Sequence, residues 1–298
     1  MSKRRKIILG AGLGYLLLLI LTVAIFGAKR RDNMDFRPQD EFKLLSWVDL
    51  PGPFDLNKAV LYVIIAAILT VVTMIFIARR MQGRPNRVQT AVEILYTTMR
   101  DNITRGNMDD KMAAKWFPFI GALFLFIWYS NLIGYIPTPT NSGEHFNLLG
   151  LKIPVFAIYA ATANVSVPLV LALIVFIAYN VEGVRAKGVG GYLKSLVPAG
   201  VTGPMVGPIF VLEFFSNFMR LISLSVRLFA NILAGHLIIL FMSGGLAVIL
   251  GLEVLGFLTV PFGILLFLFE VGLVATLQAF IFATLSAIYI GGAVADHH

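Results

Sequence analysis

The sequence contains no cysteine among its 298 residues, which excludes disulfides, thiolate zinc sites and iron–sulfur clusters. Charge is also scarce, because Asp, Glu, Lys and Arg together make up 13% of the chain. Hydrophobic residues, by contrast, make up 58%, and this balance is that of a membrane protein. The few histidines form no HExxH pattern and predict no metal site; they are His145, His236, His297 and His298.

Signatures of nucleotide chemistry are missing as well. The phosphate-binding pattern GxxxxGK[ST] does not occur, since the nearest stretch, GVGGYLKS at Gly188–Ser195, has Leu193 where a glycine is needed. No nucleophile elbow, paired-carboxylate hydrolase spacing or dinucleotide fingerprint follows a predicted strand. We therefore predict no cofactor and no nucleotide site in this chain.

The formal net charge is +8, and a basic balance of this kind raises the question of a nucleic-acid partner. The cations lie between the apolar runs rather than on one soluble face, which argues against nucleic acid. Their placement favours contacts with lipid headgroups and a role in setting membrane topology.

Six apolar runs are long enough to cross a hydrocarbon core about 30 Å thick, and they predict an all-α polytopic membrane protein. Residues 1–56 would form an N-terminal membrane helix plus an interfacial segment, and residues 57–298 a membrane domain. Val88–Arg105 reads as an amphipathic helix that is too polar to cross. The predicted spans are Ile7–Phe26, Ala59–Ala78, Phe117–Ile136, Val155–Val181, Ile209–Met242 and Ala247–Gly292.

The distribution of Lys and Arg predicts the topology. With six spans, the two termini and every second connecting segment lie on the same side of the membrane. The segments on that side hold 15 of the Lys and Arg residues, against 7 on the other side. Because the side richer in Lys and Arg is the cytoplasmic one, both termini are expected in the cytoplasm. The glycine-rich stretch Glu182–Val201 is expected to be a cytoplasmic loop. The first run is expected to be retained, because AIFGA at its end offers no clean small-x-small cleavage site. The KRRK start favours a bacterial cell membrane over an organelle membrane.

The last two runs are abnormally long for a membrane span. Ile209–Met242 would measure about 51 Å as one helix and Ala247–Gly292 roughly 70 Å, so they must tilt or break. We expect a turn at Gly244 and Gly245 and a break at Pro261. The predicted result is a long, steeply tilted hairpin that lies against a cylindrical partner.

Arg227 is close to the middle of the fifth run, where its side chain must face a protein partner or a watery cavity. Because arginine stays charged, it indicates an ion path, a voltage sensor or a counter-ion, or else a carboxylate paired with it for packing. Glu213, Arg220 and Arg227 are seven residues apart and share one helix face. Small polar residues fall on or beside this stripe, where they serve either the ion path or helix packing: Ser216, Asn217, Ser223 and Asn231.

The last run carries Glu270 and Gln278 in its interior. A carboxylic acid surrounded by hydrocarbon is able to hold and release a proton, and the imidazole of His236 is suited to the same task. These residue types together fit a proton relay. For His236 alone, an interhelical hydrogen bond is an equal alternative.

Four strings resemble, in order, segments of the a subunit of the F-type rotary ATP synthase over roughly residues 57 to 293. The resemblance implies a membrane subunit that is no enzyme by itself and binds no nucleotide. Such a subunit is a stator whose two aqueous half-channels lead protons to the carboxylates of a rotating c-ring. Its partners would be the c-ring, b-type peripheral-stalk subunits and membrane lipid. The strings are NLIGYIPTPT, TANVSVPL, SVRLFANILAGHLI and TLQAFIFATLSAIYI.

The resemblance also implies roles for the polar residues. Arg227 would keep the ring carboxylate charged and would block direct proton passage between the half-channels. Asn231 and Gln278 match positions near the arginine and would orient it. Glu213 matches the channel glutamate and would line the cytoplasm-facing half-channel. Asn217, on the polar stripe, is expected to belong to the proton path.

The opposite half-channel would contain His236 and Glu270, which fall where the family places an acid and a histidine. Glu270 precedes Gln278 by eight residues, where the family pattern implies about seven. Asn164 replaces an aspartate that many relatives carry, so we expect it at most to bind water. Arg220 matches a position that is basic without being catalytic, and we expect it to face lipid or the membrane interface.

Two other classes of protein are less consistent with these residues. A secondary transporter would bind an anionic substrate at Arg227, but it should show inverted repeats with matching broken helices, and no such internal symmetry is visible. A purely structural membrane anchor would not explain an ionic stripe in the middle of an apolar helix.

Overall fold

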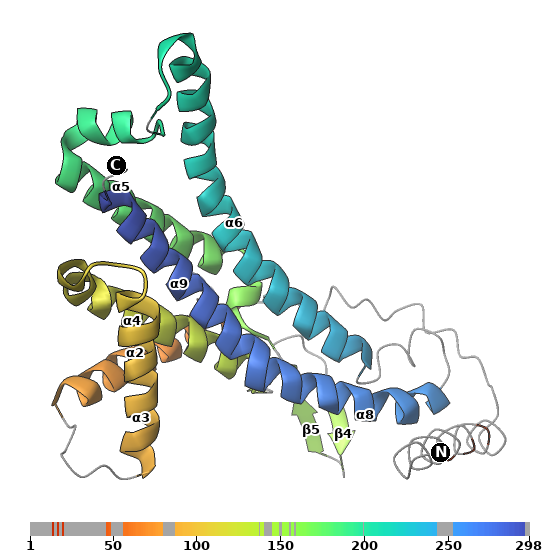
Figure 1. The fold of residues 1–298 in the computed structure, drawn as a ribbon. Coiled ribbons are helices and arrows are strands. Elements are labelled where there is room, and N and C mark those ends of the chain that lie inside the picture. The colour runs from red at the N-terminus through yellow and green to blue at the C-terminus, as the bar shows by residue number, and fades with distance from the viewer. Residues whose placement is uncertain are drawn as a thin grey trace, which may run out of the picture. The chain divides into compact units, whose positions relative to one another are not determined.

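The computed structural model describes residues 14, 17, 20, 46–48, 56–79, 87–136, 138–139, 145–148, 151–154, 156–157, 159–198, 200–242 and 253–295 (Figure 1). The chain divides into two compact units. The larger unit comprises Leu44–Leu233 and Leu273–His298, and the smaller unit comprises Met1–Lys43 and Ala234–Gly272. The predicted first span lies almost wholly outside the described residues, as does the predicted turn at Gly244 and Gly245.

The described residues contain five helices that are long and apolar enough to cross a membrane: Lys58–Arg79, Asp110–Gly134, Ser166–Ser195, Gly203–Leu240 and Thr259–Val294. This confirms the all-α polytopic class and accounts for five of the six predicted spans. The tilt of the last two helices in a membrane stays a prediction.

The first part of the larger unit follows the sequence pattern closely. Helix α2 (Lys58–Arg79) matches its predicted span to within one residue at each end. The predicted amphipathic helix is α3 (Arg87–Thr97), which continues as a π-helical turn (η2, Thr98–Arg105). Helix α4 (Asp110–Gly134) begins earlier than predicted and passes through Pro118, which membrane helices tolerate.

The predicted fourth span, Val155–Val181, is wrong at both ends. Its helix, α5, covers Ser166–Ser195, because an apolar run alone does not distinguish a strand from a helix. Short antiparallel pairs and a 3₁₀ turn occupy the preceding stretch. They are β3 (Thr138–Pro139) with β6 (Phe156–Ala157), β4 (His145–Leu148) with β5 (Leu151–Pro154), and η3 (Ala161–Ala163); an earlier pair joins β1 (Ser46–Val48) to β2 (Leu56–Asn57).

The predicted cytoplasmic loop Glu182–Val201 is helical as far as Ser195. The change of direction is concentrated at Gly188, whose φ is 74° and ψ 163°. Only glycine adopts this backbone conformation without strain. The glycine-rich composition therefore marks one kink within a helix rather than a loop.

The fifth span is one unbroken helix, α6 (Val206–Leu240), preceded by a 3₁₀ turn (η4, Gly203–Met205). The sixth consists of α8 (Glu253–Phe269), a π-helical turn (η6, Glu270–Val274) and α9 (Ala275–Val294). The predicted break at Pro261 is wrong, since this proline lies inside α8 and its missing hydrogen bond does not interrupt the helix. The irregularity lies instead at Glu270.

In the larger unit, α9 packs against both α4 and α5, and α2 packs against α4. The core between them is formed by apolar side chains of α4, α5, α6 and α9, among them Phe124, Val175, Leu228 and Phe282. From α6 the buried members are Leu224, Leu228 and Ile232. Because these residues are four apart, they fix which face of α6 is turned to the core and which is turned away.

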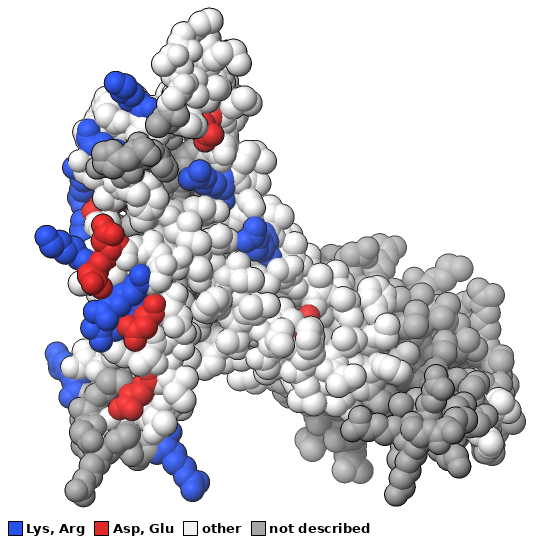
Figure 2. All heavy atoms as spheres, viewed as in Figure 1, with Lys and Arg blue, Asp and Glu red and all other residues white. Residues whose placement is uncertain are grey.

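Charged side chains of the larger unit gather along one edge, over α3, the beginning of α4 and the end of α5 (Figure 2). Two of the predicted inner segments, residues 79–115 and 183–203, contribute to this edge. The topology that the Lys and Arg distribution predicts stays a prediction. On α6, the only Lys or Arg residues are Arg220 and Arg227.

Candidate functional site

Arg227 is exposed on α6, on the side away from the core residues Leu224 and Leu228. Its exposed neighbours along α6 include the apolar Val226, 46% exposed, and the polar Ser223 and Asn231. No carboxylate within the described parts of the chain forms an ion pair with Arg227. The alternative of an internal carboxylate that neutralises it for packing thus finds no support among the described residues.

Toward the beginning of α6, a cavity of about 90 Å³ opens between α5, α6 and α9. Since a water molecule needs roughly 10–15 Å³ of such space, the cavity has room for several waters. It brings together three residues of the predicted stripe, Glu213, Asn217 and Arg220. The other polar side chains in its wall are Tyr179, Lys187, Tyr192, Ser195 and Tyr289.

A hydrogen-bonded network forms one wall of this cavity. The Tyr179 hydroxyl donates to Asn217 Oδ1 at 2.6 Å, and Asn217 Nδ2 donates to Asn180 Oδ1 at 3.1 Å. The Tyr192 hydroxyl donates to the same Asn180 oxygen at 2.8 Å. Asn217 is therefore fixed in the cavity wall by partners on α5, and the residue is 8% exposed.

The kink in α5 supplies Tyr192 to this network. After Gly188, the chain folds back so that the Tyr192 ring lies against Gly183, where any side chain would collide with it. Sequence reasoning missed Tyr179, Asn180 and Tyr192. Tyr179 and Asn180 are polar residues near the end of an apolar run, and this position could have indicated a site. Their partners were not predictable, because Asn217 lies on another helix and Tyr192 lies beyond the kink.

Arg220 lies at the same cavity, with its guanidinium carbon 5.4 Å from the centre of the Tyr289 ring, a cation–π contact. Arg220 is otherwise exposed, and its expected position, facing lipid or the membrane interface, stays a prediction. Asn231 is exposed and Gln278 is 6% exposed. Among the described residues neither hydrogen-bonds Arg227, so the structure does not assemble the predicted orienting group.

In the smaller unit, His236 and Glu270 are both buried, at 3% and 9% exposure. The Glu270 carboxylate lies against Gly235, the residue before His236, so closely that a Cβ at Gly235 would overlap it. The two predicted relay residues thus belong to one small region, formed by the end of α6 and the π-helical turn that begins at Glu270. Such turns within α-helices occur frequently at functional sites.

Asn164 has a structural task. Its Oδ1 accepts a hydrogen bond from the Ser166 backbone N–H at 3.0 Å and so satisfies a free donor at the start of α5. Burial raises the pKa of Tyr159 to about 12, and a hydrogen bond with the Asn164 side chain opposes this rise. Tyr159 therefore stays protonated at neutral pH. The predicted water-binding role of Asn164 stays a prediction.

Comparison with known proteins gives a consistent result. The profile of the ATP synthase A chain family matches residues 60–291. ATP synthase subunit a of Rubrobacter xylanophilus is 37% identical over 237 residues, which cover 79% of this chain and 83% of the relative. Subunit a of Sulfurihydrogenibium sp. is 35% identical over 236 residues, 77% of this chain and 95% of the relative. That of Nocardioides sp. is 34% identical over 251 residues, covering 81% and 83%.

Proposed function

Because the chain belongs to the ATP synthase A chain family, we propose that it is the proton-translocating stator subunit of an F-type ATP synthase. As a multi-pass membrane subunit of that complex, it works together with other subunits. The finer proposal is that residues 57–298 provide two aqueous half-channels to the carboxylates of a c-ring. Proton flow through them would turn the ring and drive ATP synthesis elsewhere in the complex.

The observation that carries this proposal is Arg227, which is exposed on α6 and has no ion-pair partner among the described residues. A permanent cation in hydrocarbon costs a few kcal/mol or more, so a partner must supply the opposite charge. A carboxylate about 4 Å away would gain roughly 4 kcal/mol at an effective dielectric constant of about 20. This attraction holds the ring carboxylate ionised, and the same field repels a proton that would cross directly.

The cavity at Glu213, which has room for several waters, supports its assignment to the cytoplasm-facing half-channel. Glu213 is partly buried, and Asn217 lies in the same wall one helical turn further along α6. A carboxylate that borders water and leads to a polar wall is suited to pass protons toward Arg227. Arg220 lines the same cavity.

His236 and Glu270 are proposed as the relay of the opposite half-channel. A π-helical turn accommodates about one residue more than an α-helical turn. The turn that begins at Glu270 therefore absorbs the additional residue in the spacing of eight between Glu270 and Gln278. The spacing of eight is thus compatible with the proposed assignment of Glu270.

We propose that the protein lies in a bacterial cell membrane with both termini in the cytoplasm. Its further partners are proposed to be b-type peripheral-stalk subunits. The charged edge of the larger unit (Figure 2) would then lie at the cytoplasmic surface. The alternative of a secondary transporter would require Arg227 to face an internal substrate site, whereas its side chain is exposed on the outside of α6.

The test is ATP-driven proton uptake by membrane vesicles that contain the whole complex. Arg227→Ala should abolish pumping, while passive proton leak under an imposed potential persists or rises because the charge barrier is gone. Arg185→Ala, which removes an exposed cation outside the cavity and the stripe, is the matched control and should pump normally. If Arg227→Ala pumps like the parent, the proposal is wrong and anion uptake by a carrier becomes the next hypothesis to test.

A further inference from the structure

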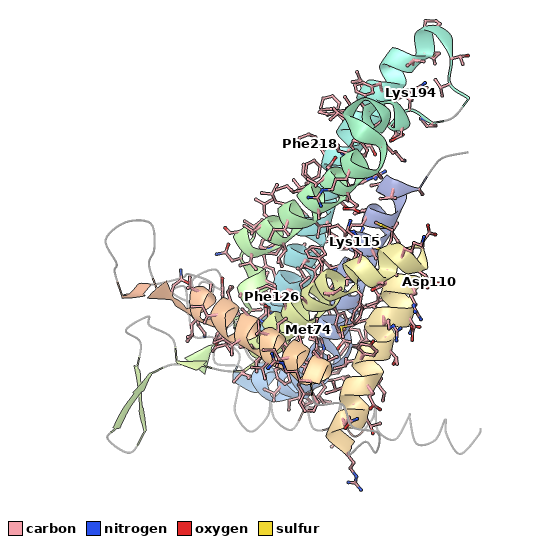
Figure 3. The ribbon with its side chains drawn as sticks, turned by 90° about the vertical axis from the view of Figure 1, so that its left-hand side faces the viewer. Met74, Asp110, Lys115, Phe126, Lys194 and Phe218 are labelled. Carbon is pink, nitrogen blue, oxygen red and sulfur yellow. The ribbon has the colours of Figure 1, made fainter. Side chains whose placement is uncertain are left out.

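Two hollows adjoin each other between α2, α3 and α4 in the larger unit. One is an open groove of about 840 Å³ and the other is a pocket of about 170 Å³. Tyr96 and Phe117 line both of them, and their rings meet edge to face with centroids 5.3 Å apart. The groove and the pocket are thus two parts of one surface depression divided by an aromatic wall. Figure 3 shows Met74, one of the groove residues, on α2.

The groove itself is apolar. Its walls come from Val71 and Ile75 of α2, which are 56% and 48% exposed, and from Pro118 and Ala122 of α4. The one hydroxyl in the wall on α2, Thr70 Oγ1, already donates to a backbone carbonyl, that of Ala66, at 2.7 Å. From Thr70 to Arg79 the groove follows α2 for about 13 Å. It therefore suits a long hydrocarbon chain.

Three arginines, Arg79, Arg100 and Arg105, lie at the end of the depression that is nearest the charged edge of the unit. Arg79 lies in the last turn of α2 and lines the groove. Arg100 and Arg105 line the adjoining pocket, and Arg100 lies 5.7 Å from the centre of the Tyr96 ring. Arg105 contacts two exposed carboxylates at 3.5 Å, which neutralise it weakly because exposed ion pairs contribute little.

We propose that this depression is a binding site for an anionic phospholipid. An acyl chain occupies the groove between α2 and α4, and the headgroup phosphate lies among Arg79, Arg100 and Arg105. Arginine is suited to this task because its planar guanidinium contacts phosphate oxygens in pairs. Basic pockets between membrane helices on the cytoplasmic side are a known way of holding such headgroups. The amphipathic α3 would then fasten α2 to α4 through a lipid as well as through protein contacts.

The composition of the groove favours a lipid over a second membrane helix. Interfaces between membrane helices are rich in small residues that let backbones approach, whereas this groove presents branched and long side chains of α2 such as Val71, Met74 and Ile75. A helix partner would also leave the arginines without a counter-charge unless it carried an acidic residue at their level. A phospholipid brings the apolar chain and the anionic group in one molecule.

The experiment uses the whole complex in vesicles of phosphatidylethanolamine with a photoactivatable phosphatidylglycerol, followed by mapping of labelled peptides. In the parent, label should be enriched on α2 and on the first half of α4, compared with a photoactivatable phosphatidylethanolamine. The combined variant Arg79→Gln, Arg100→Gln and Arg105→Gln should lose about tenfold or more of this labelling, since each cation near the surface contributes about a factor of five. Ala78→Trp, which fills the exposed end of the groove without changing charge, should displace the acyl chain and lower the labelling as well.

A matched control removes the same number of exposed cations elsewhere: Lys111→Gln, Arg185→Gln and Lys194→Gln. Labelling of α2 and α4 should survive this change. Equal loss in both triple variants would mean that total surface charge attracts the lipid, and the site would be rejected. Equal labelling by both lipids in the parent, or photocrosslinks from residue 78 or 122 to another subunit in place of lipid, would also overturn it. None of these outcomes depends on the role of Arg227.

Discussion

At the scale of single residues, Asn217 shows how one side chain combines a structural and a functional task. It accepts from Tyr179 and donates to Asn180, and it borders the cavity that contains Glu213. We expect Asn217→Leu to remove one hydrogen bond from each partner in a largely buried position, which costs about 1–3 kcal/mol for the two bonds together. Tyr179 keeps only its 3.3 Å bond to the backbone carbonyl of residue 217, and Asn180 keeps its bond from Tyr192. The measurable result is a lower temperature of inactivation of the complex together with slower ATP-driven proton uptake in vesicles.

Asn102→Leu is the control for this substitution, because Asn102 is an exposed amide on η2 outside the cavity. It should leave both readouts close to those of the parent. A parent-like pumping rate in Asn217→Leu, with only the inactivation temperature lowered, would show that the network supports the fold and takes no part in proton transfer.

The candidate site could be predicted from the sequence only where a residue is unusual for its surroundings. Arg227 and Glu213 stand out because a charge in an apolar run is costly. Tyr179 and Tyr192 do not stand out, since tyrosine is ordinary in membrane helices and their importance comes from the amides that they share, Asn180 and Asn217. Asn164 matched a family string, yet its amide is engaged at the start of α5, which no pattern in the sequence indicated.

At the scale of helices, the kink at Gly188 decides where the end of α5 lies. Its backbone conformation, φ 74° and ψ 163°, costs a residue with a side chain about 1–3 kcal/mol. We therefore expect Gly188→Ala to straighten this part of α5 and to draw Tyr192 away from Asn180. Ser195→Cys, in a chain that has no other cysteine, provides the probe, since Ser195 lines the same cavity. Its labelling by a water-soluble thiol reagent should become several-fold faster when Gly188→Ala is added.

Gly190→Ala is the matched control for the kink. This glycine lies two residues away, has no positive φ and has open space around its Cα. Alanine should therefore be tolerated there, and thiol labelling of the Ser195→Cys probe should be unchanged. If both alanine variants label alike, the left-handed conformation of Gly188 is not what holds the end of α5 in place.

The approach of Glu270 to Gly235 gives a second prediction at this scale. Alanine is the better helix former by about 1 kcal/mol, so Gly235→Ala would stabilise α6 if nothing opposed it. Because a Cβ there would overlap the Glu270 carboxylate, we expect the opposite, namely a displaced carboxylate and a severalfold lower rate of ATP-driven proton uptake. Glu270→Asp, which shortens the side chain by one methylene, should restore part of the rate when combined with Gly235→Ala.

Gly207→Ala serves as the control for Gly235→Ala, since Gly207 is also on α6 but has nothing within reach of an added Cβ. It should pump like the parent. Normal pumping in Gly235→Ala would contradict the tight approach. An equal loss in both alanine variants would point to a general effect of alanine in this helix.

The boundaries of a helix could be predicted where the apolar run is uniform. Where the run is not uniform, the predicted boundaries were wrong. Helix α2 agrees with its run to within a residue because nothing in the run competes with helix. Helix α5 does not. The mostly apolar residues 159–165 lie outside the helix, and the residues after Val181 continue the helix up to Gly188. Pro261 predicted a break that does not occur, because this proline lies inside α8. The π-helical turn that begins at Glu270 was not predicted, because no residue type in that stretch indicates it.

At the scale of the whole molecule, the face of α6 that carries Arg227 must meet the c-ring if the proposed function is right. Val226 and Asn231 are exposed beside Arg227, whereas Leu228 is 1% exposed in the core. Cysteines placed at residues 226 and 231 should therefore form disulfides, on mild oxidation, with a cysteine introduced near the ring carboxylate. A cysteine at residue 228 should not, and the absence of native cysteines in this chain keeps its own background low.

Cysteines at residues 226 and 228 are both adjacent to Arg227 but lie on different faces of α6. If only the cysteine at residue 226 forms a disulfide with the ring, the reaction reports contact with the ring and not a general reactivity of cysteines in this part of the helix. Disulfides from residues 226 and 231 to the ring would establish that the arginine faces the carboxylates, so the exposed cation has its counter-charge on another subunit. Crosslinks from these residues only to a peripheral-stalk subunit would contradict this placement. Arg227 would then lack a ring carboxylate to hold ionised, and the barrier between the two half-channels would have to lie elsewhere.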